Sequence, residues 1–268
     1  MSDATRIADW VADWIADGGS LLLLTDYDGT LTPVVGNPAD ATLSESVRDR
    51  LRALARSPKV RLGVVSGRDL DDLRVHVGLA EAIYGGCHGL EVEGPGLHFR
   101  HPEAEAQKDI LRDITRQLSD RAVAVPGMHV EAKRFGVAVH YRHVASDDVR
   151  RVEMEVARAI RRDGGRLKIF HGVKVIEIQP QVGWTKGDCV GWIRDAVRRD
   201  AGGQWMLLYM GDDWTDEHVF ESFVGQGITI RVGDGAPASR AVYRLADVAG
   251  VHGLLDTLAI RLTDGAGG

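Results

Sequence analysis

The sequence predicts an α/β protein with a doubly wound, Rossmann-like core sheet and an inserted α/β cap domain. Two observations indicate this class. Short, wholly apolar runs at residues 21–24 and 60–65 end abruptly in polar residues, as buried strands of a parallel sheet do. These runs alternate with segments of helical periodicity up to residue 101, and the same alternation resumes from residue 183. The stretch between them has a different pattern.

Residues 1–101 are predicted to form the first part of the core domain. The chain opens with an amphipathic helix, because apolar side chains recur three and four residues apart at Ile7, Trp10, Val11, Trp14 and Ile15. The elements expected after it are a strand at 21–24, a helix at 43–57, a strand at 60–65, a helix at 70–77 and a strand around Ile83. Strands and helices of these lengths are typical of βαβ units.

Residues 102–182 are predicted to form the inserted cap domain, with the element order αββαββ. The expected elements are a helix at 102–118, strand-like alternation over 128–142, a helix at 147–162 and strand-like pieces at 167–170 and 173–178. This order suits a separate layer built on an antiparallel sheet.

Residues 183–268 are predicted to complete the core domain. The expected elements are a helix from Lys186, a strand at 205–210, a helix at 216–223, a strand at 228–232 and a closing helix at 251–262. The tail at 264–268 is expected to be disordered.

The composition limits the partners of the chain. Its formal net charge is -6 over 268 residues, and no Lys/Arg run reaches five. Nucleic acid and anionic membranes need clustered positive charge, so neither is expected as a partner. The two cysteines, Cys87 and Cys189, have no metal-ligand spacing and exclude a disulfide framework. We expect no signal peptide and therefore a cytoplasmic enzyme; the composition is compatible with a monomer and does not specify the oligomeric state.

Polar residues follow the predicted strands at their carboxyl ends, where open α/β sheets bind ligands. In chain order, including the lysine that opens a helix, they are Asp26, Asp28, Ser66, Gly67, Arg68, Lys186, Asp212 and Asp213. Acids gathered at one sheet edge repel one another unless a cation neutralises them, and oxygen ligands without sulfur favour Mg²⁺. Carboxylates, a lysine, a serine and a hard metal together indicate phosphoryl transfer. No G-x-G-x-x-G motif or Walker lysine follows the first strand, which disfavours those nucleotide folds.

The positions of these residues suggest their roles. Asp26, at the tip of the first strand, is placed to attack phosphorus and form an aspartyl-phosphate. Asp28 is expected to protonate the leaving oxygen and then to deprotonate the hydrolytic water. We expect Asp26, Asp28 and Asp212 to bind the metal. Ser66 and Lys186 would stabilise charge on the transferring group.

Each motif alone is common in plain loops and at the ends of strands. Their order along the chain is what indicates a catalytic site. Four of them occur in sequence, each at the end of an apolar strand or the start of a helix. D-x-D-G-T-L at residues 26–31, the strand-terminal Ser66, the isolated Lys186 and G-D-D at 211–213 resemble the four motifs of the haloacid dehalogenase superfamily of phosphatases. More narrowly, S-G-R at 66–68 and G-D-D-W-T-D-E at 211–217 resemble the trehalose-6-phosphate phosphatases.

This resemblance extends from residue 21 to about residue 255 and implies further site residues. It implies a phosphate-binding segment that comprises Ser66, Gly67 and Arg68 together with Lys186. Asp213 and Asp216 would orient the metal waters or the lysine. One departure is that Thr185 precedes the lysine, where the family often has an acid.

The cap segments are also similar to those of that family, in which the cap closes over the disaccharide. The positions that match its sugar-binding residues are Glu131, Lys133 and Glu177, with Arg142 and His88 as further candidates. Charged groups make strong hydrogen bonds to sugar hydroxyls, which are both donors and acceptors. The alternative is that these charges line the solvated face of a cap sheet.

The residues predict a magnesium-dependent phosphatase, and the resemblance implies that its substrate is a sugar phosphate, namely trehalose 6-phosphate. The nearest alternative is a superfamily phosphatase for a related glycosyl phosphate such as glucosylglycerol phosphate. A phosphomutase is disfavoured because the cap matches the hydrolase family. A non-catalytic sugar-phosphate sensor would have no need of both Asp26 and Asp28, and an Asp26→Asn variant would distinguish it from an enzyme.

Overall fold

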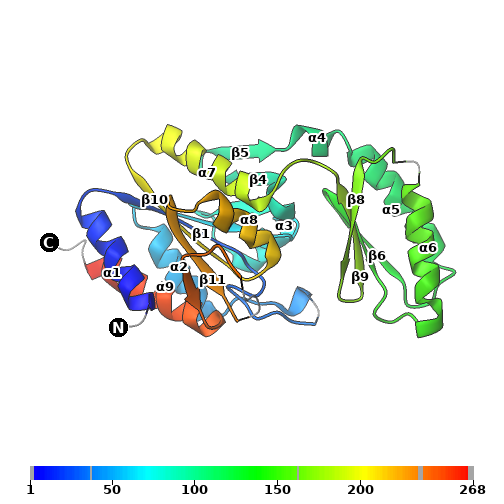
Figure 1. The fold of residues 1–268 in the computed structure, drawn as a ribbon, viewed down its shortest axis with the longest axis horizontal. Helices are drawn as coiled ribbons and strands as arrows, with labels where there is room; N and C mark the ends of the chain where they lie inside the picture. The colour runs from blue at the N-terminus through cyan, green and yellow to red at the C-terminus, as the bar shows by residue number, and fades with distance from the viewer. Residues whose placement is uncertain (1–2, 37, 162, 235–237, 265–268) are drawn as a thin grey trace. The chain divides into compact units, whose positions relative to one another are not determined.

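The computed structural model describes residues 3–36, 38–161, 163–234 and 238–264. It confirms the predicted α/β class, with a mostly parallel core sheet and a separate antiparallel cap sheet (Figure 1). The chain divides into two compact units, residues 1–99 with 184–268 and residues 100–183. The prediction of a disordered tail falls on residues 264–268, of which 265–268 lie outside the described residues.

The core unit is built on an eight-stranded sheet of order β12-β11-β10-β1-β2-β3-β4-β5. Its strands are β1 (Ser20–Thr25), β2 (Val60–Val65), β3 (Ile83–Gly86), β4 (Glu91–Gly94), β5 (Leu97–Arg100), β10 (Trp205–Gly211), β11 (Gly227–Val232) and β12 (Tyr243–Leu245). Neighbouring strands from β12 to β3 run parallel, and β4 runs antiparallel to β3. The chain therefore winds outward in both directions from the neighbouring strands β1 and β10.

The apolar run in β1 packs on both faces of the sheet. Leu21 and Leu23 belong to one buried cluster, whereas Leu22 and Leu24 belong to another. Alternate residues of a strand point to opposite faces, so a strand covered on both sides must be apolar throughout. The helices of this unit are α1 (Asp3–Ala16), α2 (Glu45–Ala55), α3 (Leu70–Val77), α7 (Lys186–Ala201), α8 (Trp214–Ser222) and α9 (Val248–Asp264), with short 3₁₀ turns at Pro38–Asp40 and Cys87–Gly89.

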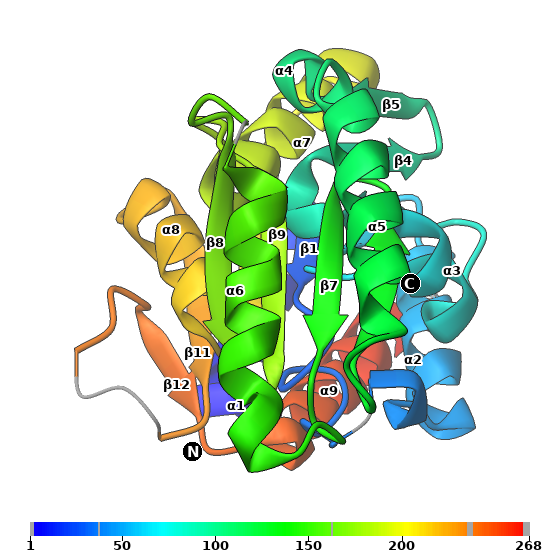
Figure 2. The same ribbon diagram turned by 90° about the vertical axis from the view of Figure 1, so that its right-hand side faces the viewer.

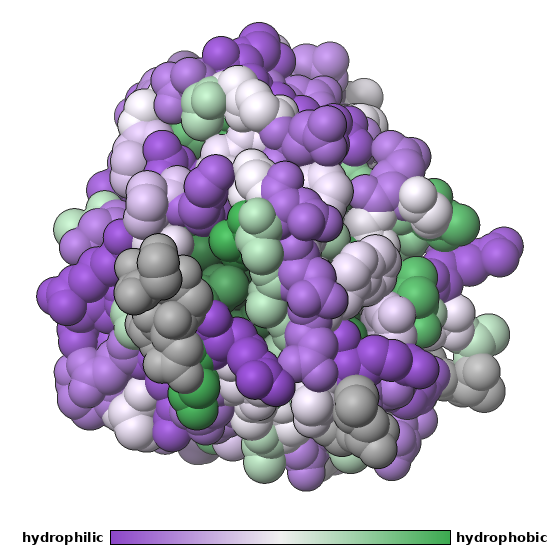
Figure 3. Space-filling view, turned by 90° about the vertical axis from the view of Figure 1, so that its left-hand side faces the viewer, coloured by the Kyte–Doolittle hydropathy of each residue, from purple (hydrophilic) through white to green (hydrophobic). Residues whose placement is uncertain are grey.

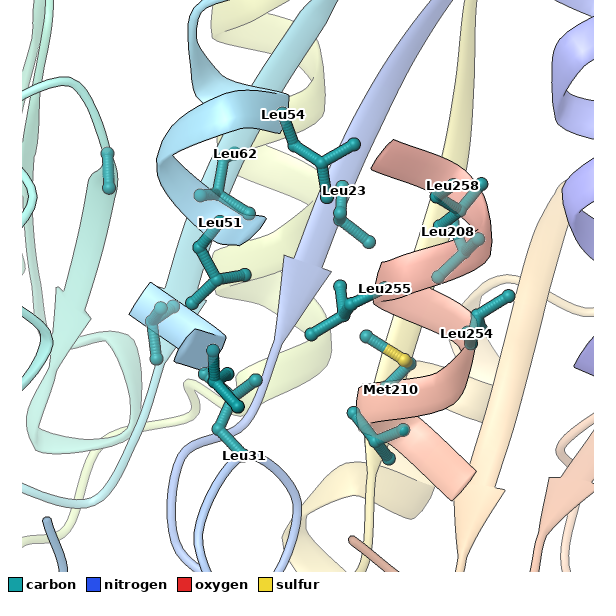
Figure 4. Packing of buried hydrophobic residues seen from close by; sticks show 14 of the residues in the cluster. Leu23, Leu31, Leu51, Leu54, Leu62, Leu208, Met210, Leu254, Leu255 and Leu258 are labelled. Carbon is teal, nitrogen blue, oxygen red and sulfur yellow. The ribbon is translucent and has the colours of Figure 1, made fainter. Parts of the chain in front are cut away.

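Helices α2 and α9 supply leucines to the cluster that contains Leu23 (Figure 4). Leu51 and Leu54 from α2, and Leu255 from α9, are buried beside the strand residues. Helices α7 and α8 supply the second cluster, together with Tyr209 of β10. The helix layers on both faces leave the carboxyl ends of the central strands as the place for polar chemistry.

Hydrophilic residues dominate the side of the molecule drawn in Figure 3. Hydrophobic residues form only small patches on this side. The large exposed hydrophobic residues that the structure describes come from different elements, such as Trp10 of α1, Val75 of α3 and Trp214 of α8. Every helix within the described ranges is too short or too polar to span a bilayer.

The cap unit consists of a four-stranded antiparallel sheet, β6-β7-β9-β8, with helices on one face (Figure 2). Its elements are α4 (Pro102–Glu105), α5 (Lys108–Ala122), β6 (His129–Lys133), β7 (Gly136–His140), a 3₁₀ turn at Ser146–Asp148, α6 (Val149–Ile160), β8 (Leu167–Gly172) and β9 (Val175–Pro180). Leu111, Ile114 and Leu118 of α5 are buried with Val152 of α6 and Ile176 of β9. The opposite face of the sheet carries the polar residues.

The structure differs from the expected elements in two places. The helix expected at 102–118 is broken between α4 and α5, and α5 continues to Ala122, whose side chain packs against the buried cluster of the cap. Strands β4, β5 and β12 were not expected. They are only three or four residues long, lie at or next to the edges of the sheet and lack a continuous apolar run.

Candidate active site

The candidate site lies where the winding of the core sheet reverses, between β1 and β10. Asp26 follows the last residue of β1, and Asp212 follows Gly211 at the end of β10. The backbone N–H of Asp26 donates to Met210 O at 2.9 Å, which ties the two strand ends together. The two predicted acids are thereby brought to the crevice where such sheets bind ligands.

The turn after Asp26 brings its backbone close to the second acid. Gly29 has a left-handed φ of 84°, and a Cβ atom at this position would collide with the Asp212 carboxylate. The Thr30 hydroxyl donates to Asp212 Oδ1 at 3.1 Å. A glycine is therefore needed both for the φ angle and for the close approach.

Lys186 connects the acids through its ammonium group. Nζ donates to Asp26 Oδ1 at 2.9 Å and to Asp216 Oδ1 at 2.8 Å, and the lysine is 2% exposed. Thr185, the departure from the family pattern, is the N-cap of α7 and forms a capping box with Asp188. This cap fixes the first turn of the helix, and with it the backbone from which Lys186 projects.

Asp216 is the most completely hydrogen-bonded acid of the site. Its Oδ1 accepts from Lys186 and from the Tyr209 hydroxyl, the latter at 2.6 Å, and its Oδ2 accepts from the backbone N–H groups of Asp212 and Asp213 at 3.0 Å. Asp213 in turn caps α8 by accepting from Thr215 N at 2.7 Å. Sequence reasoning placed Asp213 and Asp216 near the metal or the lysine but missed Tyr209, a hydroxyl inside an apolar strand run.

The electrostatics of this group favour a bound cation. One ligand oxygen from each of Asp26, Asp212 and Asp216 lies within 4.8 Å of the others. Burial and the neighbouring Asp216 and Asp212 carboxylates raise the pKa of Asp26 well above its usual value, against the lowering effect of Lys186. Burial and the Asp216 carboxylate raise the pKa of Asp212 to about 6. A divalent cation would stabilise buried carboxylates that repel one another. The residues present therefore fit a metal coordinated by oxygen ligands.

Asp28 and Arg68 form a bidentate ion pair. Arg68 Nε donates to Asp28 Oδ2 at 2.7 Å and Nη2 donates to Asp28 Oδ1 at 2.8 Å. Burial acts to lower the pKa of the guanidinium group, but the hydrogen bonds to Asp28 and Asp72 raise it above its usual value. Asp28 therefore lies against Arg68, and Asp216 is the third member of the acidic group instead of Asp28.

Ser66 and Gly67 lie beside His88. The backbone N–H of His88 donates to Ser66 O at 2.8 Å, and a Cβ atom at Gly67 would lie 2.7 Å from the His88 ring. Cys87 and His88 have positive φ angles of 51° and 57°, which non-glycine residues rarely adopt. Burial acts to raise the pKa of Asp213, but Lys186 and the hydrogen bonds from Thr215 lower it below its usual value, with a smaller contribution from His88. The structure thus brings His88 to the strand-end site.

The polar residues predicted for the cap share one face of its sheet. Glu131, Ala138 and Glu177 form one row across β6, β7 and β9. Lys133 Nζ donates to Glu177 Oε1 at 2.8 Å, and the Gln179 amide donates to Glu177 Oε2 at 2.8 Å. Gln179 was missed, although it follows Glu177 by the two-residue period of a strand.

The other two residues predicted for the cap, Glu131 and Arg142, lie in different surroundings. Glu131 Oε2 lies 2.8 Å from His140 Nε2, and both side chains are partly exposed. Arg142 lies beyond the end of β7 in an exposed turn, outside the row of strand residues. The cap sheet therefore groups Glu131, Lys133 and Glu177 and leaves Arg142 apart from them.

Known proteins resemble this chain over most of its length. A family model described as trehalose-phosphatase matches residues 24–249. The trehalose-phosphate phosphatase of Mycobacterium marinum is 37% identical over 242 residues, and that of Mycobacterium avium is 38% identical over 250 residues. These matches cover 89% and 90% of this chain but 61% and 63% of the relatives, so the chain spans about three-fifths of their length.

A solved structure shares the fold. The C-terminal domain of the C. albicans trehalose-6-phosphate phosphatase superposes with a TM-score of 0.70, covering 96% of this chain and 97% of that domain. The sequence identity is 22%, so this likeness supports the architecture and not a particular residue role.

Proposed function

The chain belongs to the trehalose-phosphatase family, and we propose that it hydrolyses trehalose 6-phosphate to trehalose and inorganic phosphate. The observation that carries the proposal is the contact of Lys186 Nζ with Asp26, beside Asp212, at the switch point of the sheet. This arrangement holds a carboxylate nucleophile and cationic charge together at the edge where a phosphate ester would bind.

In the first step, an Asp26 carboxylate oxygen attacks phosphorus. The new Asp26 O–P bond forms as the bond between phosphorus and the sugar oxygen breaks, and Asp28 gives its proton to that oxygen. Lys186 stabilises negative charge on the phosphoryl oxygens, with Ser66 and Gly67 as the further phosphate contacts. Trehalose and an aspartyl-phosphate result.

In the second step, water hydrolyses the aspartyl-phosphate. Asp28, now ionised, takes a proton from water as the water oxygen bonds to phosphorus and the Asp26 O–P bond breaks. Phosphate leaves, and the Asp26 carboxylate and the Asp28 acid are regenerated. The same residue can serve both steps because each step leaves it in the protonation state that the next one needs.

We assign Mg²⁺ to the carboxylates of Asp26 and Asp212, which would hold the ion; Asp28, the third ligand expected from the sequence, has both carboxylate oxygens hydrogen-bonded to Arg68. Asp216 already accepts four hydrogen bonds, so we assign it to orienting Lys186 and the 212–213 backbone. When bound, the ion would offset the repulsion between the acids and the charge on the phosphoryl group.

The sugar specificity is assigned to the polar face of the cap sheet. Glu131, Lys133 and Glu177 offer carboxylate acceptors and ammonium donors for sugar hydroxyls, and Arg142 and His88 are further candidates. The Lys133–Glu177 pair is partly exposed, so exchange of its partners for hydroxyl groups costs little free energy.

Phosphate release from a panel of esters tests the substrate. The panel contains trehalose 6-phosphate, glucosylglycerol phosphate, glucose 6-phosphate and fructose 6-phosphate, each at several concentrations with Mg²⁺. We expect the highest kcat/KM for trehalose 6-phosphate. A higher value for glucosylglycerol phosphate would favour the alternative substrate, and equal values for the hexose phosphates would contradict a disaccharide-reading cap.

Thermal unfolding with and without Mg²⁺ tests the metal assignment independently of turnover. We expect Mg²⁺ to raise the Tm of the EDTA-treated protein, because an ion that binds only the folded state stabilises it. Asp212→Asn should remove this shift, whereas Asp13→Asn, an exposed change in α1, should keep it. A Mg²⁺-induced shift that survives in Asp212→Asn would contradict the assignment.

A further inference from the structure

The guanidinium group of Arg68 is directed at protein oxygens. Besides its two hydrogen bonds to Asp28, Nη1 donates to Asp72 Oδ2 at 2.8 Å and Nη2 donates to Pro38 O at 2.6 Å. Among the described residues, these contacts occupy four of the five N–H donors of the Arg68 guanidinium group. A phosphate group that paired with this fork would have to displace Asp28.

Further contacts hold Arg68 itself in place. Its guanidinium carbon lies 5.1 Å from the centroid of the Tyr27 ring, and the residue is 8% exposed. Its backbone N–H donates to Ser66 Oγ at 3.2 Å, and its carbonyl accepts from Cys87 N at 2.7 Å. Both ends of the residue are therefore anchored, and Asp28 has a rigid partner.

We propose that Arg68 is a positioning residue for Asp28 and not a phosphate ligand. The proposal rests on the proposed function, in which Asp28 transfers the proton of the leaving group and then that of water. A planar fork with two parallel hydrogen bonds fixes both the place and the plane of a carboxylate. Arg68 thus sets where the Asp28 carboxyl group lies, two residues from the nucleophile, while Asp72 and Tyr27 hold Arg68.

A double-mutant cycle on trehalose 6-phosphate tests this coupling. The proteins are the unaltered chain, Arg68→Gln, Asp28→Asn and the double variant. We expect Arg68→Gln to lower kcat about 100-fold, within the range of general acid–base catalysis, with KM changed less than about threefold. The double variant should be no slower than Asp28→Asn alone, because the fork matters only while the carboxyl group is present.

Inhibition by inorganic phosphate separates positioning from phosphate binding. We expect the inhibition constant in Arg68→Gln to stay within about threefold of that of the unaltered chain, because Asp28 and not the anion is the partner of the fork. Arg74→Gln is the matched control. Arg74 is an arginine of α3 that pairs with Glu93 at 2.6 Å, away from Asp28, and its loss should leave kcat, KM and the phosphate constant unchanged.

Two results would overturn the proposal. One is a double variant whose losses multiply; the other is an inhibition constant that rises tenfold or more, as expected for a lost charged hydrogen bond to phosphate. If Arg68→Gln does not fold, Arg68→Lys keeps the charge without the fork, and the same cycle and phosphate constant decide the matter. An unaltered chain that releases no phosphate from any ester would instead remove the proposed function, and with it the premise.

Discussion

Charged residues are held differently at the candidate active site of the core unit and on the polar face of the cap sheet. At the ends of β1 and β10, Lys186 and Asp216 are almost wholly buried and are joined to Asp26 and Tyr209 by hydrogen bonds of 2.6 to 2.9 Å. On the polar face of the cap sheet, the side chains of Lys133 and Glu177 are 18% and 26% exposed. Oppositely charged groups contact one another in both places, but only the core removes them from water.

This difference matches the two tasks in the proposed function. Burial raises the pKa of Asp26 and Asp212 and strengthens each charge interaction among them, which suits a site that must stabilise a transferring phosphoryl group. Partly exposed pairs contribute little to stability and can exchange partners, which suits recognition of sugar hydroxyls. The following variants test this contrast.

Asp26→Asn should have the largest effect. A neutral amide cannot attack phosphorus, so we expect kcat for trehalose 6-phosphate to fall at least 1000-fold, about the scale of a lost nucleophile. The variant should stay folded, because it removes one charge from a crowded acidic group. Phosphate release and thermal unfolding measure both effects, with the exposed Asp13→Asn as control. Retained turnover would show that another residue is the nucleophile.

Lys186→Met should be the most destabilising change. It leaves Asp26 and Asp216 buried without their cation, so we expect the free energy of unfolding to fall by about 3–5 kcal/mol in the absence of Mg²⁺. Urea unfolding measures this loss. Lys59 is an exposed lysine that donates to the carbonyl of Gly18. Lys59→Met should therefore change the free energy of unfolding by less than about 0.5 kcal/mol. Equal losses in the two variants would remove the contrast between buried and exposed charges.

Tyr209→Phe should have an intermediate effect. It deletes one donor to the buried Asp216 carboxylate and keeps the ring, and hydrogen bonds to charged groups contribute about 1.5–3 kcal/mol. Tyr27→Phe is the matched control, because its buried hydroxyl donates to the neutral carbonyl of Ala41, and the loss of this bond should cost about 0.5–1.5 kcal/mol. A control loss as large as that of Tyr209→Phe would argue against a special role for the charged acceptor.

Glu177→Gln should have the smallest effect on stability and act on binding. We expect KM for trehalose 6-phosphate to rise about tenfold, as for one lost charged hydrogen bond, with the free energy of unfolding changed by less than about 1 kcal/mol. Steady-state kinetics and urea unfolding separate the two. Glu153→Gln, on the exposed side of α6, should change neither. A fall in kcat without a change in KM would place Glu177 in the chemistry and contradict its assignment to the sugar.

Several features of the site were predictable because they depend on position along an element. Asp26 and Asp212 end apolar runs, and parallel strands bring their carboxyl ends to one edge. Likewise, the two-residue period of a strand places Glu131 and Lys133 on one face. Lys186 was found as the first residue of a helix, although nothing in its neighbourhood reveals that its ammonium group is buried.

The contacts across the sheet were not predictable in this way. Arg68 and Asp28 are 40 residues apart and were expected to serve phosphate and leaving group separately, yet they form one bidentate pair. Likewise, the sequence pattern gives Tyr209 no role beyond that of a residue in an apolar strand. Only the folded chain shows that its hydroxyl donates to Asp216. Such pairings depend on strand register, turn geometry and packing, all of which are set by distant parts of the chain.

From the amino-acid order alone followed the α/β class, the inserted cap and the group of strand-end residues, because hydrophobic period and strand polarity are local properties. The tertiary structure decided which acid meets which base: Lys186 bridges Asp26 and Asp216, and Arg68 holds Asp28. The physical reason is that ion pairs form over a few ångströms between residues that only the folded sheet brings together.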